Sequence, residues 1–99
     1  MKENETYYIR IDSKAVDEKP PADVFNSHIS YLTEIAEKTE FYGGGFVDFP
    51  GGMIIFKADD DFHAETICKN DPLIKSGYYR YTLRQWEVVI SCPPKSPCQ

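Results

Sequence analysis

The chain has 99 residues, which favours a single domain with one modest hydrophobic core. Tyr, Phe and Trp make up 14% of the residues, and this richness argues against a disordered chain. The formal net charge of −5 argues against nucleic acid or an anionic membrane as a partner.

No apolar run approaches the roughly 20 residues that a membrane-spanning helix needs. The start of the chain lacks an apolar signal region, so we expect a cytoplasmic protein. Cys68 falls in a helical pattern and is expected to act as a small apolar residue. Cys92 and Cys98 flank a proline-rich stretch, where we expect two thiols; a disulfide or a metal pair are the alternatives.

Alternation over residues 6–12 predicts the first strand. One face of this strand carries Tyr7, Ile9 and Ile11, and the other carries Thr6, Tyr8 and Arg10. Helical spacing predicts the first helix over about 21–38, with prolines at its entry. Its apolar face contains Val24, Phe25, Ile29, Leu32, Ile35 and Ala36. His28 falls within this apolar stripe rather than opposite it.

Two further strands are expected at 41–49 and 53–58, joined by a turn at Pro50-Gly51-Gly52. The glycines at 43–45 indicate a bulge, or the close approach of a backbone or a ligand. The acidic run 59–61 supplies the N-cap and first turn of the second helix. This helix is expected to stop near Asn70-Asp71, because Pro72 disfavours helical geometry in the residue before it.

After a short link at 73–77, the pattern predicts a last strand over 78–90 and a flexible tail over 92–99. The strand changes phase, with large residues at odd positions up to Leu83 and at even positions from Trp86. Either a bulge resets the register, or both faces of the sheet are covered. In a β-α-β-β-α-β domain the helices cover only one face, so an apolar second face predicts a homodimer with sheets packed face to face.

One pair of residues has the arrangement of a chemical site. The first and third strands should be antiparallel neighbours, which makes the two helices antiparallel and brings His28 beside Asp71. A carboxylate bonded to one ring nitrogen fixes the tautomer and supports the imidazolium, and the other nitrogen is then free to move a proton on a ligand. The alternative is a hydrogen-bonded structural histidine beside a helix-ending cap.

No Ser or Cys has the context of an activated nucleophile. His63 is interpreted as a solvated surface residue. The acidic run 59–61 is interpreted as a solvated cap rather than a metal site, because consecutive side chains on a helix point in different directions. We therefore expect no metal and no cofactor.

Five short stretches across roughly residues 6–90 resemble, in order and spacing, the YciI-like (YCII-related) proteins. They are HISYL from His28, FYGGG from Phe41, GGMII from Gly51, NDPLIKSGY from Asn70 and WEVV from Trp86. The resemblance implies a ferredoxin-like α+β domain over residues 1–91, with an antiparallel four-stranded sheet, assembled as a dimeric α/β barrel. It also implies an active site built on a His and an Asp, which correspond to His28 and Asp71.

Most of that family lacks an assigned reaction, and one branch resembles a dehydrochlorinase that acts on a chlorinated hydroxyhydroquinone. The wider superfamily holds muconolactone isomerases, heme-related enzymes and monooxygenases, many of them without cofactors. The chain departs from the family pattern at Gly45-Phe46, where a small residue or Pro is expected, and Phe46 is expected to reshape the pocket.

The leading hypothesis is a cofactor-independent small-molecule enzyme of the isomerase, lyase or dehydrohalogenase type, with His28 moving a proton and Asp71 orienting it. Expected ligand-binding residues are Tyr8, Gly43, Gly44, Phe46 and Trp86, with Tyr42 as a further candidate wall. The alternatives are a non-catalytic module that binds a small ligand and a dimerisation scaffold without a ligand.

Overall fold

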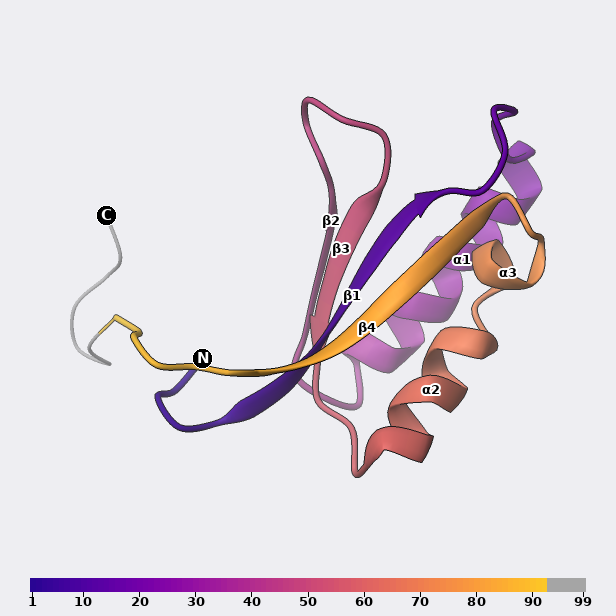
Figure 1. Ribbon diagram of the computed structural model, residues 1–99. Helices are drawn as coiled ribbons and strands as arrows, with labels where there is room; N and C mark the ends of the chain where they lie inside the picture. Colours follow the sequence, from indigo (N-terminus) through magenta and orange to yellow (C-terminus); the bar gives the residue numbers. More distant parts are fainter. Residues whose placement is uncertain (93–99) are drawn as a thin grey trace.

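A computed structural model describes residues 1–92 of the chain. The elements in chain order are β1 (Thr6–Lys14), α1 (Ala22–Ala36), β2 (Phe41–Gly45), β3 (Gly52–Phe56), α2 (Asp61–Lys69), α3 (Pro72–Lys75) and β4 (Tyr79–Glu87). The four strands form one antiparallel sheet in the order β2-β3-β1-β4 (Figure 1). The predicted ferredoxin-like α+β fold is confirmed. Cys98 and nearly all of the predicted tail lie outside the described residues.

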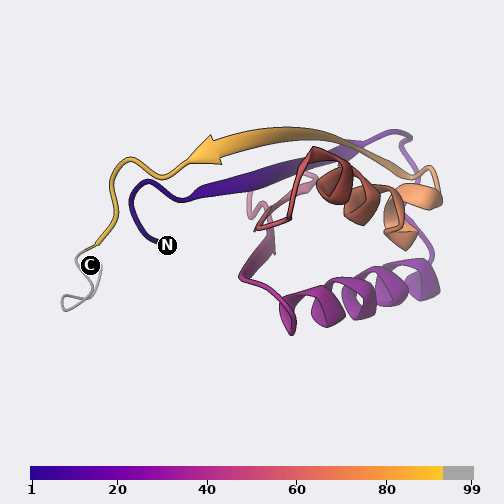
Figure 2. The ribbon, with the colours of Figure 1, turned by 90° about the horizontal axis from the view of Figure 1, so that it is seen from below.

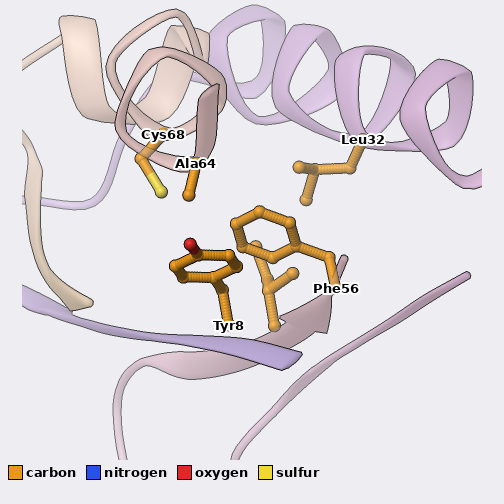
Figure 3. Close-up of a cluster of buried hydrophobic side chains, with 6 residues drawn as sticks. Tyr8, Leu32, Phe56, Ala64 and Cys68 are labelled. Carbon is orange, nitrogen blue, oxygen red and sulfur yellow. The ribbon is translucent and has the colours of Figure 1, made fainter. Parts of the chain in front are cut away.

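Both long helices lie on one face of the sheet, and no helix covers the other face of residues 1–92 (Figure 2). The core lies between the sheet and the helices (Figure 3). Its buried members are Tyr8, Leu32, Ile54, Phe56, Ala64 and Cys68. Removing these apolar groups from water is the main force that holds the two layers together. Within residues 1–92, no helix has the length and apolar character needed to cross a bilayer.

Strand β1 turns its polar residues toward the helices. Tyr8 lies in the core, so the alternation of a strand places Arg10 and Asp12 on the same side. Arg10 is 1% exposed and Asp12 is 6% exposed. Ile9 and Ile11 therefore point to the face that has no helices, which is the reverse of the usual arrangement for a strand with one covered face.

Strand β4 contains no bulge. It pairs with β1 without interruption, from Thr6 opposite Glu87 to Lys14 opposite Tyr79. The phase change in the sequence therefore means that both faces of β4 carry large side chains. Of the two explanations that the sequence left open, the continuous pairing excludes the bulge.

The segment after α2 differs from the predicted link. Residues Pro72–Lys75 form the short helix α3, whose N-cap is Asp71. Pro72 suits the first turn because its missing N–H would have no partner there. Strand β2 is also shorter than predicted and ends at Gly45, since the backbone N–H of Phe46 donates to the carbonyl oxygen of Gly51 and closes the hairpin.

The apolar stripe of α1 is only partly covered. His28 and Leu32 are buried, whereas Phe25 and Ile29 are 47% and 46% exposed. The part of the sheet near these residues is the β2–β3 hairpin, which is rich in glycine and offers few side chains to fill the space. A hollow therefore remains between α1 and the hairpin.

Gly51 is required by its backbone geometry. Its φ is +116°, and a Cβ atom built there would lie 2.3 Å from the carbonyl oxygen of Asp12. Its neighbour Gly52 is similarly constrained, because a Cβ atom there would lie 2.6 Å from the carbonyl oxygen of Gly44. These two glycines let the turn pass close to the backbone of adjacent strands.

We expect Gly51→Ala to lower the free energy of unfolding by about 2 kcal/mol or more, because the backbone must move to relieve the clash. Urea denaturation followed by circular dichroism measures this change. Gly44→Ala is the matched control, since a Cβ atom there meets nothing within 4 Å. Its expected change is within about 0.5 kcal/mol, and equal losses in the two variants would contradict the explanation.

Candidate active site

His28 of α1 contacts Asp71, the residue that joins α2 to α3. The Nδ1 atom of His28 lies 2.8 Å from both carboxylate oxygens of Asp71. His28 is 7% exposed and Asp71 is fully buried. The antiparallel order of the two helices predicted this contact, and the structure contains it.

The local backbone holds the Asp71 carboxylate in place. Asp71 is extended, with φ −67° and ψ 125°, as expected for a residue that precedes a proline. Its Oδ1 atom accepts a hydrogen bond of 2.9 Å from the backbone N–H of Leu73, which caps α3. From the sequence, a capping role for Asp71 was an alternative to a catalytic pair with His28. In the structure the same carboxylate caps α3 and contacts His28.

A third side chain, Arg10, reaches the same carboxylate from strand β1. Its NH1 atom lies 2.9 Å from Oδ2 of Asp71. Its Nε and NH2 atoms lie 2.6 and 2.7 Å from the two carboxylate oxygens of Asp12. Arg10 thus bridges two buried carboxylates, and a buried charge needs such partners to offset its loss of hydration.

Sequence reasoning missed Arg10 and Asp12. Their signal was present: two opposite charges lie two residues apart on a predicted strand, hence on one face, while the other face is apolar. Such a pair on a strand next to a histidine-bearing helix points to a buried ion pair, provided that this face is the covered one.

These contacts determine the ionisation of the site. Burial alone raises the pKa of the Asp71 carboxyl group, but hydrogen bonds from His28 and Leu73 and the charge of Arg10 bring that pKa below its ordinary value. Burial of Arg10 lowers its pKa, yet the hydrogen bonds and charges of Asp12 and Asp71 raise it overall. Asp71 is therefore an anion and Arg10 a cation at neutral pH.

The second ring nitrogen of His28 faces open space. Nε2 has no hydrogen-bond partner among residues 1–92, although every buried side-chain nitrogen and oxygen in that part of the chain has one. Nε2 is therefore not sealed in the core. His28 is also one of the residues that line a cavity.

This cavity has a volume of about 640 Å³ and lies between α1 and the β2–β3 hairpin. Such a volume suits a small organic ligand. Most of its wall is apolar and includes Phe25, Ile29, Leu32, Phe41 and Ile54. The polar side chains in the wall are Asp12, Lys19, His28, Thr33 and Tyr79. A ring compound with one polar edge fits this distribution.

Two of the expected ligand-binding residues, Gly43 and Gly44, lie in the wall of this cavity. The other three are not among the described residues that line it. Tyr8 lies in the core and donates a hydrogen bond of 2.7 Å to Asp61. Phe46 follows the end of β2 and is 39% exposed.

Trp86 lies on the face of the sheet that has no helices, where it pairs with Tyr7, and their rings are 6.5 Å apart. The structure therefore does not bring Tyr8, Phe46 or Trp86 together with His28. His63, expected at the surface, is 45% exposed in its side chain, and its Nδ1 accepts a hydrogen bond of 3.0 Å from the backbone N–H of Asp59.

The acidic run 59–61 acts as a helix start, with Asp60 as the N-cap that accepts from the backbone N–H of His63. Among residues 1–92, no group of three or more His, Cys, Asp or Glu side chains is arranged to hold a metal ion.

The sequence matches no protein-family model and no curated protein. Among solved structures, the chain is similar to 5-chloro-2-hydroxyhydroquinone dehydrochlorinase (TftG) from Burkholderia phenoliruptrix AC1100 in complex with 2,5-dihydroxybenzoquinone. The two chains share the fold. The TM-score is 0.63 and the sequence identity is 18%, and the match covers 82% of this chain and 93% of TftG. At this identity the likeness establishes the fold alone.

We expect Asp71→Asn to lower the free energy of unfolding at neutral pH by about 3 kcal/mol, because the buried partners of the carboxylate lose their counter-charge. The folded-state pKa of Asp71 is lowered, so its ionisation stabilises the protein fully above the unfolded-state pKa of about 4 and progressively less below it. The difference between the wild type and the variant should therefore shrink as the pH falls below about 4. Urea denaturation at neutral and acid pH measures both effects.

Asp60→Asn is the matched control, because it makes the same chemical change at a helix cap that has no buried ion pair. Asparagine caps a helix about as well as aspartate. The control should change stability by less than about 0.5 kcal/mol. Similar losses in the two variants would show that capping, and not charge, accounts for the effect at Asp71.

Proposed function

We propose that this chain is a small-molecule enzyme in which His28 transfers a proton to or from a ligand in the cavity and Asp71 orients the imidazole. One observation carries the proposal: Nδ1 of His28 contacts Asp71, Nε2 has no hydrogen-bond partner within residues 1–92, and His28 lines a cavity of about 640 Å³. With Nδ1–H donated to the carboxylate, Nε2 accepts a proton in the neutral ring and donates one in the imidazolium. These are the two states that a general acid–base catalyst alternates between.

The proposed reaction is of the isomerase, lyase or dehydrohalogenase type. Each of these reactions can include a proton transfer between the ligand and a group of the enzyme, and in the lyase and dehydrohalogenase types a leaving group also departs. The proposal uses only groups of the chain itself and no cofactor. The similarity to TftG, a dehydrochlorinase in complex with 2,5-dihydroxybenzoquinone, favours small hydroxylated ring compounds as the first substrates to test.

We further propose that the chain belongs to the YciI-like proteins and forms a homodimer through the face of the sheet that has no helices. Four large apolar or aromatic side chains on that face remain substantially exposed: Ile11 at 40%, Tyr42 at 45%, Met53 at 36% and Trp86 at 40%. An exposed patch of this kind marks an interface. A second copy is the proposed occupant, because the same patch on two copies gives a closed two-fold contact.

The catalytic role of His28 is tested with His28→Gln, which keeps a polar side chain of similar size. Thermal-shift screening of hydroxylated quinones, hydroquinones and lactones selects ligands, and absorbance spectroscopy follows their turnover. We expect the variant to lose about 10²- to 10⁴-fold in kcat/KM with its fold retained, the range typical of a general acid–base group. His63→Gln is the control and should keep wild-type activity.

A second candidate is a non-catalytic module that binds a small ligand. It is favoured by the fact that Asp71 already caps α3 and pairs with Arg10, two structural tasks that require no turnover. In that case the wild type binds ligands without converting them, and His28→Gln lowers only the affinity. Turnover by the wild type that His28→Gln abolishes would exclude this candidate.

The dimer is tested with Ile11→Glu, which places a charge in the middle of the exposed sheet face. We expect sedimentation equilibrium to show a dimer for the wild type and a monomer for the variant, because a buried, unpaired carboxylate costs several kcal/mol. Phe62→Glu, at a side chain that is 80% exposed on α2, is the control and should remain dimeric. A monomeric wild type at micromolar concentration would overturn the proposed dimer.

A further inference from the structure

The four buried ionisable side chains of the site do not balance in charge when His28 is neutral. Arg10 contributes one positive charge, and Asp12 and Asp71 contribute one negative charge each. The group is neutral as a whole only when His28 is an imidazolium. In a low-dielectric interior, excess charge without a partner is costly, and an imidazolium would complete the charge balance of this group.

The other titratable side chains near His28 do not change the net charge of this group. Tyr31 on α1 and Cys68 on α2 remain neutral, because burial raises their pKa values, that of Cys68 to about 11. Burial and a hydrogen bond to Glu65 likewise raise the pKa of Tyr81 on β4. The remaining cation at the cavity is Lys19, which is exposed and forms no ion pair with any residue of the described part of the chain.

We propose that the cavity binds a ligand that carries an oxyanion, such as a carboxylate, phenolate or enolate, and that His28 holds it as an imidazolium donor. In this proposal Arg10 and Asp12 are positioning residues: they act on the ligand through the charge state of His28. The Nε2–H group donates a charge-assisted hydrogen bond to the oxyanion. Lys19 supplies the positive charge that balances the ligand, and the apolar wall receives its ring.

This inference deepens the proposed function and rests on it only for the location of the ligand. Binding can be measured without turnover, so the two ideas can fail separately. A protein that prefers anions but converts none of them would retain this inference and lose the proposed enzyme. A protein whose turnover depends on His28 but which binds neutral ligands equally well would do the opposite.

The first test compares benzoate with benzamide, a neutral molecule of nearly the same shape, by isothermal titration calorimetry. We expect the wild type to bind benzoate about tenfold or more tightly at neutral pH, as a hydrogen bond between charged partners typically provides. Raising the pH from about 6 to about 9, where an imidazolium loses its proton, should weaken benzoate binding and leave benzamide binding unchanged. Equal affinities, a flat pH profile for benzoate, or no binding of either probe at millimolar concentration would overturn the inference.

The second test separates a charge effect from a structural one. Asp12→Asn removes a negative charge, so the pH at which benzoate affinity falls should move down. Arg10→Gln/Asp12→Asn removes one charge of each sign and should return that pH toward the wild-type value. A purely structural role predicts the opposite order, because two core substitutions disturb packing more than one.

A surface variant keeps the inference testable if the buried variants do not fold. Lys19→Met should reduce the preference for benzoate over benzamide at least threefold, as loss of an exposed counter-charge typically does. Lys38→Met is the control, since Lys38 is also exposed but does not line the cavity. An unchanged preference in Lys19→Met, or an equal loss in both variants, would contradict the assignment of Lys19.

Discussion

The ion pair of Arg10 with Asp12 and Asp71 is the constraint on which the rest of this structure depends. It joins the interior strand β1 to Asp71, the N-cap of α3, and through Asp71 it reaches His28 on α1. Arg10 and Asp71 are both almost wholly buried, so neither can exchange its partner for water. Losing one member of such a group leaves a buried charge without compensation, at a typical cost of about 3–5 kcal/mol. Each of these four side chains therefore depends on the others for its charged or hydrogen-bonded partner.

The cavity follows from a second constraint, the glycine content of the β2–β3 hairpin. A helix with an apolar stripe normally packs against side chains of the sheet, and each buried aliphatic group then adds to stability. Here the stripe of α1 runs past glycines, so Phe25 and Ile29 line an open space instead of a packed interface. Gly51 and Gly52 are fixed by backbone contacts, but Gly43 and Gly44 are not subject to such close backbone contacts. Backbone geometry alone therefore does not explain why the sequence leaves this space unfilled, whereas the proposed ligand site would.

Sequence patterns were sufficient for the fold and for the meeting of His28 with Asp71, because both follow from strand alternation, helical spacing and antiparallel order. They were not sufficient for Arg10 and Asp12. Alternation shows which residues share a face but not which face the helices cover, and the apolar face of β1 is the uncovered one. Helix α3 was missed for a related reason: a residue before proline is barred from helical geometry, yet the proline itself can begin a new helix. Tyr8, Phe46 and Trp86 were expected at the ligand but do not line the cavity. The abundance of aromatic residues predicts that many are buried, but it does not say which residues each one packs against.

Strand β1 contributes to the proposed ligand site with one face and to the proposed dimer interface with the other. Arg10 and Asp12 point toward the helices and the cavity, while Ile9 and Ile11 point toward the proposed second subunit. Successive residues of one strand share the same peptide planes, so a displacement of one face displaces the other. Packing a second copy against Ile11 would fix the position of β1 and therefore that of the guanidinium that holds Asp71. In the proposed dimer, assembly therefore further restrains the position of Asp71 and His28, because the strand that forms the interface is also the strand that supplies the buried cation.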